Sequence, residues 1–321
     1  MTTHLFDYIN HWDFWLAFNS LVAIGALAID RIFGEFLNKH HPVSWIGRWI
    51  MWFEKHFYKN TVIRGVQLWL TISALTLTVS LIILLVVNYL PIVFSLIFLT
   101  VFTSTLLAHK MLHDSVQEVA NSEHPQKMVK MLVSRDCQNM KKNEAYKAAV
   151  ETYAENLSDG VVAPWFYLII FGIPGILLYK AINTMDSMVG YRNQKYENFG
   201  KCAAICDDIA NYIPARITAI FIMLAFKKYK FWQFYTNGKQ HLSPNAGHPI
   251  TAIALGCKCQ LGGPTVYDGK LKAKATFGPQ DSTKNISPKH IHCALQIRNF
   301  IDMTLLSLSL GIFITTFLWI L

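Results

Sequence analysis

The stretch VQLWLTISALTLTVSLIILLVV, residues 66 to 87, contains no charged residue, no proline and no glycine. A helix needs about 20 such residues to cross the hydrocarbon core of a bilayer, because it rises by about 1.5 Å per residue. The stretch therefore predicts a transmembrane helix, and it indicates that the chain is an integral membrane protein.

Further apolar stretches are candidates for membrane segments. They cover residues 14 to 29, 92 to 108, 161 to 179, 212 to 226 and 303 to 321. Two of them are interrupted. Residues 161 to 179 contain Pro164, Gly172, Pro174 and Gly175, and residues 212 to 226 contain Pro214 and Arg216. Interruptions of this kind are typical of broken or re-entrant helices.

The composition agrees with a membrane protein, since 53% of the residues are hydrophobic and only 15% are charged. We predict an all-α, polytopic integral membrane helical bundle with about 4–6 membrane segments, some broken or re-entrant, and cytoplasmic loops. Residues 1 to 321 are expected to form a single membrane domain. Within it, 110 to 160 and 227 to 302 are predicted to be cytoplasmic loop regions.

The net charge of +9 is divided among separate basic blocks rather than gathered in a tail. Lys and Arg recur in 30 to 65, 110 to 147 and 227 to 302, whereas the 88 to 91 turn has none. The positive-inside rule makes these blocks cytoplasmic, and a lipid bilayer rather than nucleic acid is the expected partner. Residues 180 to 211 are also basic, and the sequence does not decide on which side they lie.

The six cysteines show no paired CxxC framework, and Cys257 and Cys259 are too close for a comfortable bridge. We therefore expect reduced thiols. The N-terminus has no basic region followed by a small-residue cleavage site, so no removable signal peptide is expected.

A row of carboxylates precedes the interrupted segment. Glu151, Glu155 and Asp159 are spaced by four residues, which places them on one helical face. One interpretation is a solvated helix face beside the membrane. The alternative is a site for Mg²⁺ or a cationic group, because hard divalent ions bind carboxylate oxygens and bridge them to phosphates.

Three other stretches combine polar and charged residues with apolar neighbours. They are YKAINTMDSMVGYRN (179 to 193), CDDIANYIPARIT (206 to 218) and the turn-rich LSPNAGHP (242 to 249). A fourth stretch, HHPVSWIGR (40 to 48), has a histidine before a proline. Charges in apolar company usually have a partner or a function. The alternative interpretations are helix ends with snorkelling Lys and Arg side chains and buried structural ion pairs. No P-loop or dinucleotide fingerprint is present, so the sequence does not indicate how a nucleotide would bind.

Together these stretches resemble one family, the adenosylcobinamide-phosphate synthases of the CobD/CbiB type, from about residue 26 to residue 300. The resemblance rests on Asp30, Gly34 and HPV at 41 to 43, SRD at 134 to 136, AVETYAENLSDGVVAP at 149 to 164, YKAINTMDSMVGYRN, DDIANYIPAR at 207 to 216, SPNAG at 243 to 247 and LGGPTVYDG at 261 to 269. The chain departs from the family pattern near Glu35 and at His248, where the family usually has an aromatic residue.

The resemblance implies a carbon–nitrogen ligase of cobalamin biosynthesis in the bacterial inner membrane. The reaction would join adenosylcobyric acid, a corrinoid, to aminopropanol or its phosphate, with ATP and Mg²⁺ as cofactors. Other cobalamin-biosynthesis proteins are possible partners. Such a reaction must activate a carboxylate, hold phosphates and deprotonate an ammonium, and carboxylates with Mg²⁺, Lys and Arg are suited to these tasks.

Site roles are assigned from residue chemistry at the positions that the resemblance marks. The candidate catalytic residues are Glu151, Glu155, Asp159 and His41, with Glu151 or His41 as the base. Metal or amine binding is assigned to Glu155, Asp159 and Asp186. The substrate- and phosphate-binding set is Lys180, Asn183, Asp186, Arg192, Asp207, Asp208, Arg216 and Asn245.

Two other classes of function fit the same pattern. One is a non-catalytic membrane sensor or scaffold, like the distantly similar AmpE proteins, and neighbouring genes would separate it from a ligase. The other is a corrinoid transporter, which fits the interrupted helices and would move a corrinoid without forming a bond.

Overall fold

A computed structural model describes residues 12–35, 41–133, 137, 140–267, 270–272 and 274–320. The chain divides into two compact units, which are described in turn. The first comprises residues 1–108, 163–210 and 305–321, and the second comprises 109–162 and 211–304. The two stretches predicted as cytoplasmic loop regions, 110 to 160 and 227 to 302, thus fall entirely in the second unit.

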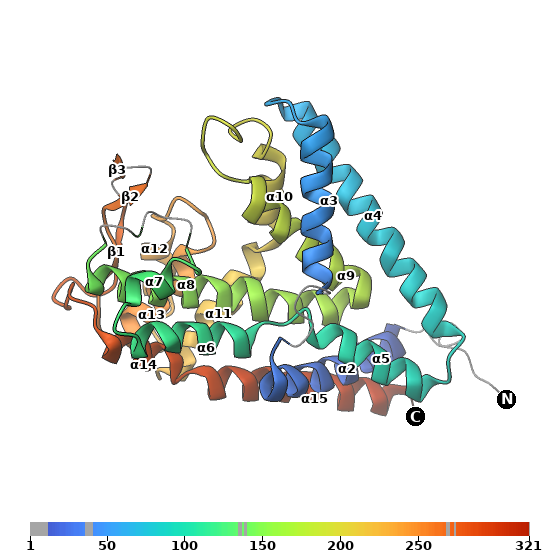
Figure 1. The fold of residues 1–321 in the computed structure, drawn as a ribbon. Helices are drawn as coiled ribbons and strands as arrows, with labels where there is room; N and C mark the ends of the chain where they lie inside the picture. The colour runs from blue at the N-terminus through green and yellow to red at the C-terminus, as the bar shows by residue number, and fades with distance from the viewer. Residues whose placement is uncertain are drawn as a thin grey trace. The chain divides into compact units, whose positions relative to one another are not determined.

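The first unit is built from long helices. They are α2 (Trp12–Phe33), α3 (Pro42–Phe57), α4 (Val62–Asn88), α5 (Ile92–Ser104), α9 (Ala163–Val189), α10 (Lys201–Ala210) and the C-terminal part of α15 (Arg298–Ile320) (Figure 1). Helix α9 packs against α2, α3, α4 and α10. A buried apolar cluster that includes Ile50, Leu68, Ile72, Tyr179 and Met185 joins α3, α4 and α9.

The second unit consists of shorter elements. Its helices are α6 (His109–Asn121), α7 (Pro125–Val129), α8 (Lys142–Leu157), the π-helical turn η2 (Ser158–Val162), α11 (Tyr212–Ala225), α12 (Trp232–Gly238), α13 (Gly247–Gly256) and α14 (Pro288–Leu295). Two short antiparallel ladders follow α13. Strand β1 (Leu261–Gly262) pairs with β4 (Thr276–Phe277), and β2 (Thr265–Tyr267) pairs with β3 (Lys270–Lys272). These ladders are the small β component that the sequence did not predict.

Within the described part of the chain, five helical stretches are long and apolar enough to cross a membrane, or six if the pair α10 and α11, interrupted near Asn211, counts as one span. The five are Trp12–Phe33, Val62–Asn88, Ile92–Asn121, Lys142–Val189 and Pro288–Ile320. The prediction of an all-α, multi-pass membrane protein is therefore confirmed. Pro91 and the Ser95 hydroxyl, which donates to the Val87 carbonyl at 2.6 Å, form the tight turn between α4 and α5.

Helix α9 is broken at Gly172, as the Pro and Gly content of the segment predicts. Gly172 has φ 61° and ψ −149°, a conformation that L side chains avoid. Pro174 has no N–H, so the Ile170 carbonyl loses its normal helical donor. In the structure Trp15 Nε1 donates to that carbonyl at 3.2 Å, and Asn19 Nδ2 donates to the Ile169 carbonyl at 3.3 Å. Helix α2 thus satisfies the backbone groups that the break exposes, as a membrane segment requires.

The segment 191 to 200 is bound to the corner between α3 and α4. Asn60 Nδ2 donates to the Gln194 carbonyl at 2.9 Å, and Asn60 Oδ1 accepts the backbone N–H groups of Asn198 and Phe199 at 3.1 and 3.2 Å. Gly65 packs so closely on the Phe199 carbonyl that a Cβ atom would lie 2.1 Å from its oxygen. Segment 191 to 200 therefore lies at the same end of the first unit as the α3–α4 corner.

The prediction that all six cysteines are reduced is wrong for two of them. Cys257, the residue after α13, and Cys293 in α14 form a disulfide with their Cα atoms 5.8 Å apart. The sequence excluded only the pairing of near neighbours, whereas this pair is brought together by the packing of the second unit. The other four cysteines, Cys137, Cys202, Cys206 and Cys259, are thiols that form no disulfide, as expected.

Candidate functional site

In the first unit, the C-terminal half of α9 presents a polar face towards α10. Lys180 is buried, Asn183 and Asp186 are half-buried, and all three lie within two helical turns. Asn183 Nδ2 donates to Asp207 Oδ1 at 3.2 Å, which joins the two helices. Asp208, the next residue of α10, is close enough to Arg192 for their charges to interact. The predicted residues of both motifs are thus brought together in one unit.

His41 lies in the same unit, where it caps the start of α3. Its Nδ1 accepts the Val43 N–H at 3.2 Å, and Pro42 occupies the first turn, where a missing N–H costs nothing. Burial lowers the pKa of His41, an effect opposed by the carboxylate of Glu35 and reinforced by the charge of Lys180. A neutral imidazole near a lysine can accept a proton, which is what a base requires.

In the second unit, Arg216 of α11 reaches the turn before α13. Its Nη1 donates to Asn245 Oδ1 at 3.2 Å, and its Nη2 donates to the Pro244 carbonyl at 3.3 Å. The guanidinium also stacks on Tyr212 at 3.5 Å from the ring centroid. Because the planar group is held on three sides, Arg216 presents a fixed positive charge beside the SPNAG turn.

The carboxylate row of the sequence has three different environments. Glu151 is buried, Glu155 is exposed and Asp159 is half-buried. Glu151 and Glu155 belong to α8, whereas Asp159 lies in the π-helical turn η2. Turns of this kind are frequent at functional sites. The exposed Glu155 and the half-buried Asp159 are the members of the row that a ligand can reach.

Glu151 holds a loop that the sequence did not connect with it. Its Oε1 accepts the backbone N–H of Gly262 at 2.7 Å, while Lys147 Nζ, one turn earlier, donates to the Gly262 carbonyl at 2.8 Å. Gly262 and Gly263 both have positive φ angles. His241 lies near enough to interact with Glu151 and Lys274, and burial lowers its pKa. Lys147 and His241 are therefore polar members of this region that the sequence motifs missed, although Lys147 is four residues from Glu151.

A second feature missed from the sequence is a buried polar network. His109 Nδ1 and Asp302 Oδ1 are 2.6 Å apart, and His109 Nε2 lies 3.5 Å from the Tyr153 hydroxyl. His109 and Asp302 stand at the ends of two predicted membrane segments. An ionisable residue at each of these positions is the signal that could have identified the pair.

The predicted residues divide between the units. The first unit holds His41, Lys180, Asn183, Asp186, Arg192, Asp207 and Asp208, and the second holds Glu151, Glu155, Asp159, Arg216 and Asn245. The SRD motif at 134 to 136 lies outside the described residues. Among the residues that the structure describes, no group of three or more His, Cys, Asp and Glu side chains is arranged to hold a metal ion. The roles assigned to the twelve residues stay predictions.

The fold and these polar regions define a class, a multi-pass helical membrane protein with charged residues gathered beside its membrane segments. The family comparison is more specific, because the model of the CobD/CbiB protein family matches residues 23–298. The chain belongs to the CobD/CbiB family.

Several relatives share much of the chain. A cobalamin biosynthesis protein CobD of Clostridium perfringens is 36% identical over 82% of this chain and 88% of its own length. A probable CobD protein of Pyrococcus furiosus is 35% identical over 75% and 85%. The CobD protein of Halalkalibacterium halodurans is 32% identical over 88% and 93%. No solved structure matches the chain.

Proposed function

We propose that the protein is an adenosylcobinamide-phosphate synthase, a ligase of cobalamin biosynthesis. It would join the propionate carboxylate of adenosylcobyric acid to the amine of aminopropanol or aminopropanol phosphate, at the expense of ATP. The observation that carries the proposal is the family match over residues 23–298, which includes all twelve predicted site residues. The basic blocks further suggest that the protein lies in a bacterial inner membrane with these loops on the cytoplasmic side, where ATP is available.

The reaction forms one C–N bond. The amine nitrogen attacks the activated carboxyl carbon, an oxygen of the original carboxylate leaves with phosphate derived from ATP, and the proton of the ammonium passes to a base. Lys180, Arg192 and Arg216 carry the positive charges assigned to the phosphates. His41, whose pKa is lowered by burial, is in the protonation state that a base needs at neutral pH.

Mg²⁺ is assigned to the carboxylates of Glu155 and Asp159, with Asp186 as a further candidate. The donor set fits this ion, because Mg²⁺ usually takes one or two carboxylates and completes its shell with water and substrate phosphates. When bound, the ion would neutralise phosphate charge. The protein's own contribution is to hold the two carboxylates one turn apart, at the junction of α8 and η2.

The test is an assay on purified protein in detergent or nanodiscs. Adenosylcobyric acid, ATP and Mg²⁺ are combined with aminopropanol, aminopropanol phosphate or ethanolamine phosphate, and products are identified by mass spectrometry. An amide product that depends on ATP supports the ligase. If no amide forms with any amine, even after extracts containing the other cobalamin enzymes are added, the proposal is wrong. Corrinoid uptake into vesicles without amide formation would instead indicate a transporter.

A further inference from the structure

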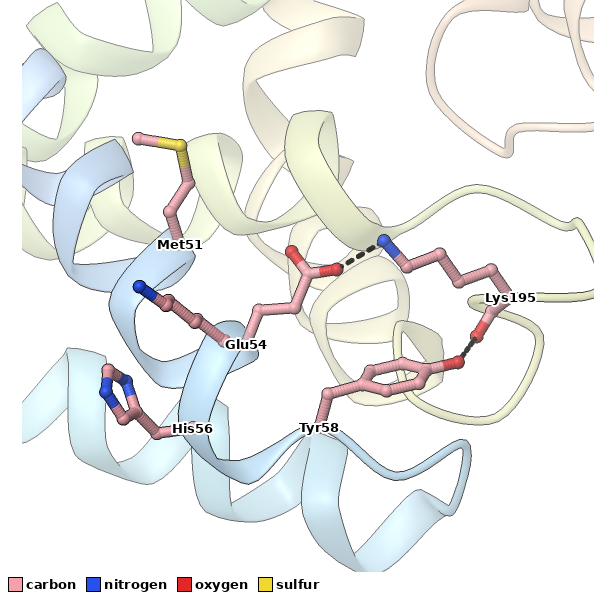
Figure 2. Close-up of a pocket in the computed structure, with 6 residues that line it drawn as sticks. Met51, Glu54, His56, Tyr58 and Lys195 are labelled. Atoms are coloured by element: carbon pink, nitrogen blue, oxygen red, sulfur yellow. Dashed lines mark hydrogen bonds and ion pairs between the residues drawn. The ribbon is translucent and has the colours of Figure 1, made fainter.

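A polar pocket of about 420 Å³ lies beside the C-terminal turn of α3, and none of the residues that line it is assigned to ligation (Figure 2). Its lining residues are Met51, Glu54, Lys55, His56, Tyr58 and Lys195. Five of them come from α3 and the residue after it, and Lys195 comes from the segment bound to the α3–α4 corner. The pocket is therefore contained within the first unit.

The one acid of the pocket is neutralised by its neighbours. Glu54 Oε1 forms an ion pair with Lys195 Nζ at 2.6 Å and accepts the Tyr196 hydroxyl at 2.8 Å. Figure 2 shows the Glu54 carboxylate pointing towards the Lys195 ammonium, and the Tyr58 hydroxyl donating to the Lys195 carbonyl. The Lys195 ammonium also lies 4.7 Å from the Tyr196 ring centroid. With Glu54 paired, Lys55 gives the pocket a net positive charge.

The side of α3 that faces away from the core has the composition of an interfacial helix. Its inner face buries Ile46, Ile50 and Phe53. The outer face exposes about half of Trp45 and Trp52, with 47% and 54% of their surface accessible. Exposed Trp side chains mixed with Lys and Arg are typical of helices that lie at the boundary between lipid headgroups and acyl chains.

Basic residues on α3 and around the pocket add to this pattern. Arg48 lies over the Trp45 ring at 5.7 Å, and the His56 ring lies beside Trp52, tilted, with the ring centroids 5.1 Å apart. Residues 42 to 64 form α3 and the corner after it, and residues 190 to 201 include the segment bound at that corner; in both ranges together, Lys and Arg outnumber acids. These are Arg48, Lys55, Lys59, Arg64, Arg192, Lys195 and Lys201 against Glu54 and Glu197. This end of the unit therefore attracts an anionic membrane surface.

We propose that α3 lies in the interface of the anionic membrane leaflet and that the pocket beside its last turn binds the headgroup phosphate of an anionic phospholipid. Trp45 and Trp52 set the depth of the helix. Lys55 and His56 face the phosphate, while the Glu54–Lys195 pair and Tyr58 form the opposite wall. The site is independent of the proposed ligation, because none of its residues belongs to the ligation set.

The test uses the full chain in nanodiscs of phosphatidylcholine mixed with phosphatidylglycerol, with retained lipids identified by native mass spectrometry. The wild type should retain phosphatidylglycerol in preference to phosphatidylcholine. Lys55→Gln should weaken this preference by about fivefold, as expected for one basic residue near an anionic surface. Met51→Glu, which adds an acid to the pocket wall, should weaken it further. Lys59→Gln is the matched control, because it removes the same charge from the neighbouring loop outside the pocket.

Loss in Lys55→Gln and Met51→Glu with retention in Lys59→Gln supports the site. Equal losses in Lys55→Gln and Lys59→Gln would overturn it in favour of diffuse charge attraction. Equal retention of both lipids by the wild type would also overturn it. Stabilisation of the detergent-solubilised protein by inorganic phosphate, without a preference for phosphatidylglycerol, would overturn it as well, because a soluble anion would then be the ligand.

Discussion

The carboxylate of Glu151 accepts the backbone N–H of Gly262 at 2.7 Å, across 111 positions of the chain. Lys147, on the same face of α8, binds the carbonyl of the same glycine. Both polar groups of Gly262 are thus held by one helix. This relationship gives Glu151 a structural task beside the chemical one assigned from its sequence motif.

Replacing Glu151 by alanine should loosen the loop after β1. The substitution leaves the Gly262 N–H without its acceptor, which costs about 1–3 kcal/mol when the group is buried. Hydrogen exchange of the Gly262 amide should therefore accelerate in Glu151→Ala. Glu151→Gln keeps an acceptor oxygen and should preserve most of the protection.

The two variants also separate the roles of Glu151. If Glu151 only anchors the loop, Glu151→Gln retains ligation and Glu151→Ala loses it together with loop protection. If Glu151→Gln protects the loop but abolishes ligation, Glu151 is the base and the anchoring role is secondary. Unchanged amide exchange in Glu151→Ala would contradict the contact itself.

Glu155 and Asp159 should determine the Mg²⁺ requirement of the proposed ligation. Both are accessible, so Glu155→Gln and Asp159→Asn remove negative charge without leaving a cavity. We expect the Mg²⁺ concentration for half-maximal activity to rise by roughly tenfold or more, since metal sites lose about this much when a supporting group is removed. The exposed Glu123 serves as the control, and Glu123→Gln should titrate like wild type. Wild-type Mg²⁺ titrations in both site variants would show that the ion binds elsewhere.

The membrane segments could be predicted because their information is local. Uninterrupted hydropathy defines α4 and most of α15, and Gly172 with Pro174 marks the break in α9. The donors that repair this break could not be predicted, because Trp15 and Asn19 lie more than 140 positions away in the sequence. Only packing of α2 on α9 brings them to the two carbonyls.

The candidate site shows the same division between local and distant information. Polar motifs marked Asn183 and Asp207, whose side chains do meet. Motif analysis gave no reason to join Glu151 to Gly262 or Cys257 to Cys293, because each pairing depends on how short elements of the second unit pack. Spacing along a helix identifies which side chains share a face, but it carries no information on what lies opposite that face.

Trp15 and Asn19 should each be important for the stability of the broken helix. Trp15→Phe removes the donor to the Ile170 carbonyl, and Asn19→Leu removes the donor to the Ile169 carbonyl. Each buried carbonyl left unsatisfied should cost about 1–3 kcal/mol. Thermal unfolding in detergent should show a lower midpoint for both variants, while Trp12→Phe, at an exposed position of the same helix, should match wild type. Midpoints equal to wild type in both would mean that other groups satisfy the carbonyls.

Histidine burial should make the protein less stable in acid. Burial and the charge of Arg216 lower the pKa of His248 from its ordinary value of 6.5. The unfolded state therefore takes up the proton first as the pH falls, so this contribution to stability is complete above about pH 6.5 and is lost below it. His248→Phe keeps an aromatic ring against Tyr235 and cannot titrate. Its melting temperature should fall less than that of wild type between pH 7.5 and 5.5, and parallel curves would contradict the prediction.

The contact of Asn60 with segment 191 to 200 predicts the side of the membrane on which this segment lies. Because Asn60 binds Gln194, Asn198 and Phe199, the segment shares the side of the α3–α4 corner, and α4 separates that corner from the turn at Tyr89. Because residues 110 to 160 are also predicted to be cytoplasmic, both ends of the stretch from 163 to 189 would then face the cytoplasm, and the break at Gly172 would make it re-entrant.

The test is labelling of Gln194→Cys, Lys59→Cys and Tyr89→Cys with a membrane-impermeant maleimide, in intact cells and in inverted vesicles. Peptide-resolved mass spectrometry distinguishes the introduced thiols from the native ones. Positions 194 and 59 should react only in inverted vesicles and position 89 only in intact cells. Reaction of position 194 together with position 89 would mean that 163 to 189 crosses the membrane completely.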